Sequence, residues 1–342
     1  MAREITTYGD ISPRTAGYVV AQLLERGQHL LVTERFGQAK PLPKKKTKTI
    51  IFRRYESLPR ATAPLAEGIP PAGHKLTYTD ISATLEQYGD KVEITDVIAD
   101  THEDPVLQEA VKLCSEQIAE TIEVIRISVL KGGTTVFYAN NASARTSVGA
   151  TISRGDLRRI VRFLRRQKAQ PISEIVKASA KISTEPVGPA FFALAHTDLA
   201  PDIRNLPGFV GVEHYSDSDK ALPGEIGKCE DVRFILTPLF EPWEAAATSV
   251  STTAFLSQGA IPSSAANPDV YPVIIVAKDA YAIIPLQGKN AVTPAVMNPD
   301  KITKDDPLGQ KGFVSWKTYQ TAVILNQNWL VRYEVACTAM PS

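Results

Sequence analysis

The stretch 76–95 constrains the fold more than any other feature, because its twenty residues follow the period-two pattern of an extended strand. Its apolar residues alternate in three runs, and the phase of the alternation changes between runs. At about 3.3 Å per residue the stretch spans roughly 65 Å, more than a compact domain usually offers one strand. We therefore expect a β-hairpin that projects from the body, with a bulge or bend at the phase changes, the second of which holds Gly89.

The other strand of this hairpin is predicted directly upstream. Residues 48–54 are rich in β-branched and aromatic side chains, as strands are. Between the two strands, 56–75 contains four prolines and two glycines, which is typical of a loop. Residues 1–46 end in a basic stretch with two prolines, so they are expected to form an extended arm rather than an independent domain.

A long helix is predicted after the hairpin, over 104–131. Asp104 suits the N-cap, Pro105 suits the first helical position, and Gly132 with Gly133 ends the helix. At 1.5 Å per residue it is roughly 40 Å long. The residues spaced for one buried stripe are Leu107, Val111, Cys114, Ile118, Ile122, Ile125 and Val129. The glutamates expected on the rest of the surface are Glu109, Glu116, Glu120 and Glu123.

A second helix is expected to begin at Ser153, which forms a capping-box-like entry with Asp156. Its apolar side chains fall on one face, and its other faces are strongly basic. The candidate binding residues of this helix are Arg158, Arg159, Arg162, Arg165 and Arg166. Two interpretations remain open. These arginines contact DNA phosphates, or they form a solvated face or pair with acidic side chains, for which 61–130 is the candidate segment.

The region after residue 188 alternates short apolar runs with turn signals. Strands are predicted at 232–237, 273–277, 281–284 and 329–337, with a tight turn at 278–279. Helices concentrate before residue 170 and strands after it, which favours an α+β fold over a doubly wound sheet.

Charge is distributed in blocks of alternating sign although the formal net charge is only +1. Residues 1–60 carry 12 Lys and Arg against 5 Asp and Glu, whereas 61–130 carry 4 against 13. Such blocks either neutralise each other within one molecule or let the basic segment contact an acidic segment of a neighbouring subunit. The candidate inter-subunit contacts are Lys44, Lys45, Lys46, Arg53, Arg54 and Glu67.

Enzymatic motifs are missing from the sequence. It contains no phosphate-binding glycine loop, no G-x-G-x-x-G, no H-E-x-x-H and no G-x-S-x-G. The three cysteines are widely separated, which disfavours a zinc site and fits reduced thiols. The first ten residues lack the apolar core of a signal peptide, and no apolar run approaches the ~20 residues of a membrane span. We expect a protein without catalytic activity, cofactor, metal or membrane association.

Several separated strings, taken in order, resemble the tailed-phage major capsid proteins of the Hong Kong 97 fold, in the branch of the N-four-type short-tailed phages. These strings are FRRYESLP at 52–59, YTDI at 78–81, EQYGD at 86–90, DVIADTHEDP at 96–105, LPGEIG at 222–227, VRFI at 232–235 and DPLGQKG at 306–312. The resemblance covers roughly 50–340.

The resemblance implies an N-terminal arm over 1–46, an extended loop over 47–98, and a peripheral domain over 99–189 with the spine helix at 104–131. It further implies an axial domain over 190–304 and C-terminal strands over 305–342 that return to the peripheral domain.

The implied function is a non-enzymatic subunit that forms hexamers and pentamers of an icosahedral shell around double-stranded DNA, bound without sequence specificity. Portal and scaffold or cementing proteins are the further partners expected. The implied location is the virion capsid, after assembly in the host cytoplasm. An encapsulin-like compartment is the alternative within this fold, and a DNA-binding protein that uses the arginine-rich helix is an alternative outside it.

Overall fold

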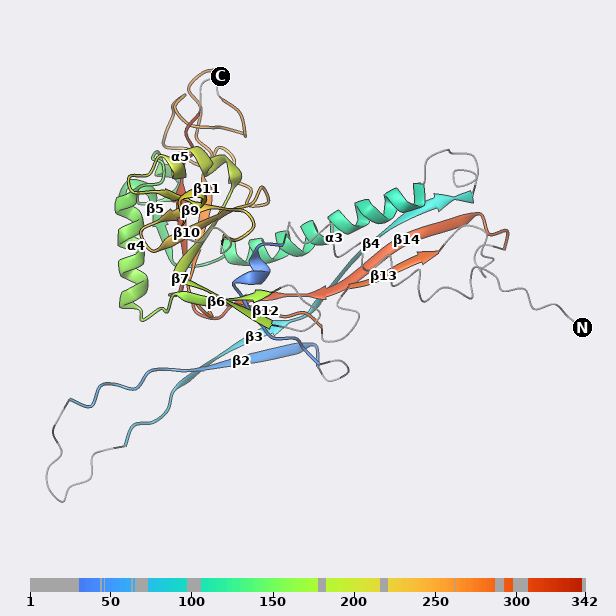
Figure 1. Ribbon diagram of the computed structural model, residues 1–342, viewed down its shortest axis with the longest axis horizontal. Coiled ribbons are helices and arrows are strands. Elements are labelled where there is room, and N and C mark those ends of the chain that lie inside the picture. Colours follow the sequence, from blue (N-terminus) through green and yellow to red (C-terminus); the bar gives the residue numbers. More distant parts are fainter. Residues whose placement is uncertain are drawn as a thin grey trace, which may run out of the picture.

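Three parts of the chain lie apart in the computed structural model (Figure 1). We call them the body, which holds most of the strands, the wing, which is a long helix beside a narrow sheet, and the hairpin, which projects from the base of the body. The structure describes residues 31–43, 45, 47–62, 64, 73–96, 106–177, 183–215, 221–261, 263–286, 292–297 and 307–339. It contains both helices and strands, as the sequence predicts.

The body is built on a mixed sheet in the order β5-β16-β11-β7-β10-β9-β8, with β6 paired to β7. Its strands are β5 (Val136–Tyr138), β6 (Ile172–Lys177), β7 (Ser183–Ala195), β8 (Val210–Gly211), β9 (Glu225–Cys229), β10 (Val232–Leu236), β11 (Tyr271–Val276) and β16 (Leu330–Val335). The predicted strands near 232, 273 and 329 are therefore confirmed. They lie in the middle of the sheet because their side chains are apolar on both faces.

The two faces of this sheet contact different parts of the molecule. On one face, Phe191 and Val273 pack against the helices α4 (Arg154–Arg166) and α5 (Ala200–Arg204). On the other face, Phe192 and Ile274 belong to a second core that includes Phe36 of the N-terminal segment and the end of the long helix. Short 3-10 turns among the described residues are η2 (Thr33–Arg35), η3 (Ala139–Asn141), η4 (Arg145–Ser147), η5 (Thr197–Leu199) and η6 (Val212–His214).

The wing consists of α3 (Val106–Lys131) beside a three-stranded antiparallel sheet in the order β13-β14-β4. Its strands are β4 (Glu86–Thr95), β13 (Val292–Met297) and β14 (Lys311–Gln320). Apolar side chains of α3, among them Val111, Ile118 and Ile122, pack against Val314 and Trp316 of β14. The predicted long helix is thus confirmed from residue 106, whereas the capping residues Asp104 and Pro105 lie outside the described residues.

The predicted buried stripe of α3 is confirmed over Val111–Ile122, but the prediction is wrong toward the end of the helix. Ile125 and Val129 are only half-buried, and Glu123, expected on the surface, is fully buried. The reason is that α3 leaves the wing sheet at this point and enters the core of the body, which contacts a different side of the helix through Ile127 and Leu130.

The hairpin is shorter than predicted. Strand β2 (Thr49–Tyr55) pairs with β3 (Tyr78–Thr84), but the continuation β4 pairs with β14 of the wing. The stretch 76–95 is therefore two strands in two sheets, and the second phase change marks the passage between them at Leu85. Neither pairing contains a bulge, so a bulge at the first phase change is wrong. At the second, the extended stretch is interrupted at Leu85 between the two sheets, and Gly89 lies beyond this point in the regular pairing of β4 with β14.

A small sheet, in the order β1-β12-β15, joins the three parts. Its strands are β1 (Gln38–Ala39), β12 (Tyr281–Ile283) and β15 (Ala322–Ile324). The predicted turn at 278–279 is present, but it leads from β11 into this second sheet. Ala282 and Ile284 pack against Phe52 at the base of the hairpin.

Several elements link the segments 99–189, 190–304 and 305–342. Strand β7 spans residue 189, and α4 shares one core with strands from 232 to 335. Strand β13, within 190–304, lies in the wing, and β16, within 305–342, lies in the body sheet.

Gly89 is required by a close approach between strands. A Cβ atom at this position would lie 2.6 Å from the carbonyl oxygen of Trp316, which is backbone and cannot rotate away. We predict that Gly89→Ala lowers the free energy of unfolding by about 1–3 kcal/mol, as overpacking does, measured by urea denaturation. Gly155→Ala is the matched control, because only a serine hydroxyl 3.9 Å away faces that position in α4. Equal stability of the two variants would contradict this account.

Candidate functional surfaces

The outer face of the hairpin carries apolar side chains on either side of the exposed Arg53–Asp80 pair, and no described residue covers them. Cross-strand pairs on this face are Ile51 with Ser82 and Tyr55 with Tyr78, and the opposite face is the one that packs through Phe52 on the small sheet. The large apolar side chains that are more than half exposed on the hairpin are Ile51, Tyr55, Leu58, Leu76 and Tyr78. A cluster of this kind on a projecting element is typical of a surface that binds another protein.

Two predicted contact residues lie on this hairpin. Arg53 forms a two-pronged ion pair with Asp80 across the strands, at 2.8 and 2.9 Å, and its guanidinium lies 4.2 Å from the centre of the Tyr78 ring. The hydrogen bond from Arg53 holds the pKa of Asp80 below its usual value. Arg53 therefore links β2 to β3 across the hairpin. Arg54 points to the base of the hairpin, where it donates a hydrogen bond to the Leu325 carbonyl at 3.4 Å.

Arg54 lines a groove of about 580 Å³ between the base of the hairpin and the end of α3. A second cavity, of about 460 Å³, lies where β3 gives way to β4 and is lined by Lys45 and Lys48. Lys45 is exposed and has a left-handed backbone, with a φ of 60°. The other predicted contact residues, Lys44, Lys46 and Glu67, lie outside the described residues.

Helix α4 begins as predicted. The Ser153 side chain accepts a hydrogen bond from the Asp156 backbone at 3.2 Å, which caps the first turn. The apolar side of α4 is completely covered by the body core, so all of its arginines lie at or near the surface. The buried residues of this side are Leu157, Ile160, Val161 and Leu164.

The arginines of α4 divide into two groups. Arg158 donates to Glu230 at 3.0 Å, and Arg165 forms an ion pair with Asp231. Both acids lie in the tight turn between β9 and β10. The prediction that acids of 61–130 pair with this helix is therefore wrong for Arg158 and Arg165. The hydrogen bond from Arg154 is the largest cause of the lowered pKa of Glu230.

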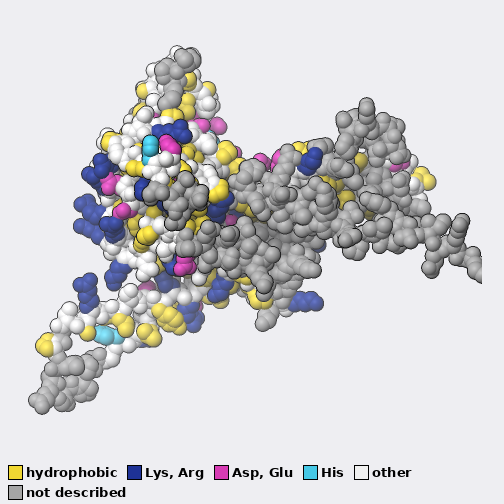
Figure 2. Space-filling model, in the orientation of Figure 1, with side chains coloured by type: hydrophobic (Ala, Val, Ile, Leu, Met, Phe, Trp, Pro, Cys, Tyr) yellow, Lys and Arg dark blue, Asp and Glu magenta, His cyan; other side chains and the backbone are white. Residues whose placement is uncertain are grey.

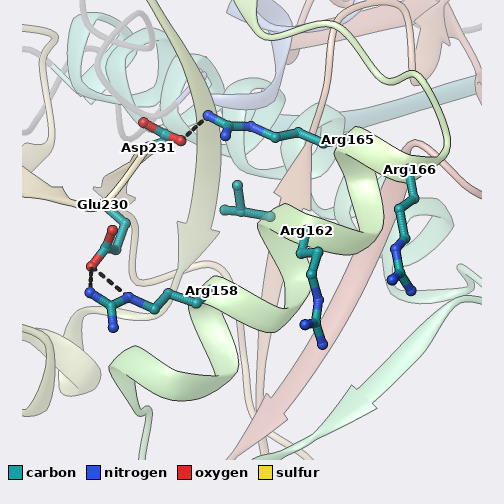
Figure 3. A pocket seen from close by; sticks show the side chains of 7 residues that line it. Arg158, Arg162, Arg165, Arg166, Glu230 and Asp231 are labelled. Carbon is teal, nitrogen blue, oxygen red and sulfur yellow. Dashed lines mark hydrogen bonds and ion pairs between the residues drawn. The ribbon is translucent and has the colours of Figure 1, made fainter.

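The other arginines do not share these acids. Arg159 turns back toward its own helix, where it pairs with Asp156 at 3.1 Å. Arg162 and Arg166 are exposed and form no ion pair within the described part of the chain. Figure 3 shows these two guanidinium groups on the same side of α4, pointing away from Glu230 and Asp231. A shallow cavity of about 430 Å³ is lined by Arg158, Arg162, Arg165 and Arg166.

A buried carboxylate fixes the N-terminal segment to α3. Glu123 accepts hydrogen bonds from the backbone amides of Val32 and Thr33, at 3.2 and 2.8 Å, and from the Thr33 hydroxyl at 2.7 Å. The Thr33 carbonyl in turn accepts a hydrogen bond from the hydroxyl of buried Tyr281. No local pattern in the sequence indicates this site, because the partners of Glu123 are main-chain groups about 90 residues away.

Arg126 completes this site one turn further along α3. Its guanidinium is almost fully buried, pairs with Glu34 at 3.3 Å and donates to the side chain of Gln320 at 3.3 Å. Burial raises the pKa of the Glu123 carboxyl, and the positive charge of Arg126 opposes that rise. The segment 32–34 is thus held where the wing, the body and the small sheet meet.

Sites of other kinds are missing from the part of the chain that the structure describes. There, no group of three His, Cys, Asp or Glu side chains is arranged to hold a metal ion. No described helix combines the length and the apolar character needed to cross a membrane. His196 accepts a hydrogen bond from the Asp198 backbone and caps a short turn. The three cysteines are buried and form no disulfide.

A comparison with protein families gives one decisive match: the model described as "Phage capsid protein" matches residues 78–330, which is most of the chain. This chain belongs to the phage capsid protein family. Capsid proteins are structural subunits. The matched range includes β3, the whole wing helix and nearly all of the body, and it begins inside the hairpin.

Individual relatives agree with this assignment. The major capsid protein of Pseudomonas phage KPP21 is 24% identical over 269 residues, which are 73% of this chain and 66% of that protein. The capsid protein of Ralstonia phage GP4 has a TM-score of 0.66 at 9% identity and covers 91% of this chain and 92% of its own. The SrpI encapsulin of Synechococcus elongatus is less similar, with a TM-score of 0.51 at 12% identity over 100% and 94% of the two chains. The structural likenesses show a shared fold.

The buried Glu123 predicts an unusual pH dependence of stability. Because its pKa is raised in the folded state, this group binds more protons when folded than when unfolded. Its contribution to the free energy of unfolding is therefore largest below about pH 4.5 and is lost as the pH rises through the raised pKa.

We predict that Glu123→Gln removes this loss, so that the stability of the variant relative to wild type increases as the pH rises from 4.5. Urea denaturation at a series of pH values measures it. Glu120→Gln, an exposed position on the same helix, is the control and is expected to follow the wild-type curve. Parallel curves for Glu123→Gln and wild type would refute the argument.

Proposed function

We propose that this chain is the major capsid protein of a tailed phage, and that it assembles with copies of itself into hexamers and pentamers of an icosahedral shell that encloses double-stranded DNA. Its membership of the phage capsid protein family supports this proposal, as does its similarity to the KPP21 capsid protein. The observation that carries it is the group of exposed apolar side chains on the outer face of the hairpin, which the described residues of the subunit leave uncovered.

The hairpin is built to be completed by another molecule. A two-stranded sheet is only marginally stable alone, and this one is anchored at its base while its outer face is exposed. Burial of Ile51, Tyr55 and Tyr78 against a second copy would stabilise both the hairpin and the contact, at about 25 cal/mol per Å² of apolar surface. Repetition of one such contact around a closed ring builds a symmetric oligomer.

We further propose the Hong Kong 97 fold, with the parts revised. The hairpin is the extended loop, the wing is the peripheral domain with α3 as its spine helix, and the body is the axial domain. The elongated wing helix and the sheet along it support this assignment (Figure 1). The N-terminal arm joins the wing and the body through Glu123 and Arg126.

The N-four-type branch is part of this proposal, on the strength of the ordered strings that begin at 52–59. Portal and scaffold or cementing proteins are the partners we propose beyond the subunit itself. Assembly would take place in the host cytoplasm, and the finished shell would be part of the virion.

The proposal predicts that apolar side chains on the hairpin control assembly. Ile51→Thr combined with Tyr55→Thr keeps strand-forming residues but removes the exposed apolar surface. We expect folded subunits whose affinity for one another is about tenfold weaker or worse, seen as loss of particles in negative-stain electron microscopy and analytical ultracentrifugation. Deletion of 56–75 is expected to block assembly completely.

Ile51→Val with Tyr55→Phe is the matched control, because it preserves the apolar face and is expected to assemble as wild type does. Normal shells from both the threonine variant and the deletion would contradict the proposed role of the hairpin.

An encapsulin-like compartment for cargo enzymes is the second candidate, since the SrpI encapsulin shares the fold. The family match and the KPP21 relative favour the phage capsid. The two differ in content: particles isolated from the native source are expected to have the high ratio of absorbance at 260 to 280 nm that packaged DNA produces. A ratio typical of protein alone, with an enzyme copurifying, would favour the compartment.

A further inference from the structure

We propose that the outer face of α4 binds phosphate groups of double-helical DNA, with Arg162 and Arg166 as its free contacts and Arg158 and Arg165 at its edge. This inference rests on the proposed function, because a shell around a genome places some face of every subunit against DNA. It adds which face that is: the flank of the body on which α4 lies.

Charge on this face is left uncompensated. Two carboxylates in the β9–β10 turn neutralise Arg158 and Arg165, and nothing in the described chain neutralises Arg162 or Arg166. These two are four residues apart, so their like charges repel each other along the helix. An anion between or beside the two guanidinium groups would remove this repulsion.

The spacing suits a repeating anion. Arg158, Arg162 and Arg166 recur every four residues, or about 6 Å along one side of the helix. A guanidinium binds a phosphate through two parallel hydrogen bonds, and it stays charged at every physiological pH. Figure 2 shows Lys and Arg side chains spread along this flank of the body, so the charge of α4 is not confined to one point.

The lack of exposed apolar side chains on α4 favours DNA over a protein partner. The apolar residues Leu157, Ile160, Val161 and Leu164 are all buried, and no large hydrophobic side chain of the helix is exposed. Protein interfaces have a core depleted of charge and enriched in apolar and aromatic groups. The hairpin carries the exposed apolar and aromatic side chains of such a core, on either side of one mutually neutralised pair, Arg53 with Asp80, whereas α4 offers charge alone.

The same face lacks the means to read a sequence. Phe163, the one aromatic residue of α4, is half-buried and packs edge-on against Phe137, with 5.5 Å between the ring centres. It is therefore not free to stack on bases. Contacts limited to phosphates bind every sequence alike and depend strongly on salt.

Binding of a fluorescently labelled DNA duplex of arbitrary sequence to the purified full-length subunit tests the proposal. Fluorescence anisotropy gives the dissociation constant at salt concentrations from about 50 to about 200 mM. The test variant is Arg162→Gln with Arg166→Gln, which removes two exposed charges and keeps good helix-forming residues. The matched control, Arg204→Gln with Lys317→Gln, removes two exposed charges from α5 and β14.

We expect the test variant to bind DNA at least about tenfold more weakly, and its log-log salt slope to fall by about 1.8, since each phosphate contact contributes about 0.9. The control should stay close to wild type. Glu230→Gln with Asp231→Asn should bind DNA more tightly, because it frees Arg158 and Arg165. Equal affinities of the test and control variants would overturn the proposal.

Two further measurements separate this proposal from its alternatives. If the test variant loses affinity for a polyglutamate peptide but not for DNA, the face binds protein carboxylates and the proposal is wrong. The same variants are examined for shell assembly by electron microscopy. Loss of shells with unchanged DNA affinity would make α4 a subunit contact and refute this inference alone. Failure of the wild-type chain to assemble with its partners would refute the proposed function, whatever α4 binds.

Discussion

Burial of the Glu123 carboxylate costs free energy, and main-chain donors from the N-terminal segment offset that cost. An isolated buried charge is strongly unfavourable, but this one accepts three hydrogen bonds from Val32 and Thr33 and lies near Arg126. Because removal of any partner would leave a buried charge unsatisfied, the segment 32–34 cannot leave α3 without a large penalty. The relative positions of body, wing and small sheet depend on this contact, which touches all three.

The hairpin and the body represent opposite solutions to the burial of apolar surface. The central strands of the body are covered on both faces. Helix α4 covers one face, and the core that contains Phe36 and the end of α3 covers the other. The hairpin covers only the face that carries Phe52 and leaves Ile51, Tyr55 and Tyr78 exposed. A subunit that must join copies of itself needs stability in one part and incomplete burial in another. The hairpin supplies the incompletely buried surface without lowering the stability of the body, because the body has a core of its own.

Exposed apolar surface and unpaired charge are on separate elements. The outer face of the hairpin carries one charged pair, Arg53 with Asp80, whose members neutralise each other between the apolar side chains. Helix α4 buries its apolar side and exposes arginines, of which two have no acidic partner among the described residues. Apolar burial supplies affinity between subunits, whereas exposed charge acts over distance and weakens with salt. Such a division would let one subunit contact its copies and a polyanion through different faces.

The sequence by itself determined the elements whose signals are local. The body of α3, the capped start of α4 at Ser153 and the strands near 232, 273 and 329 follow from periodicity and capping, which depend on neighbours within a few residues. Ordered strings such as that at 52–59 also pointed to the family. Only the tertiary structure decided that 86–95 pairs with β14, that Glu123 is buried and that Glu230 and Asp231 pair with α4. Each of these contacts joins residues separated by 66 or more positions. A period-two pattern states that a strand has two faces, but it does not state which distant strand lies beside it.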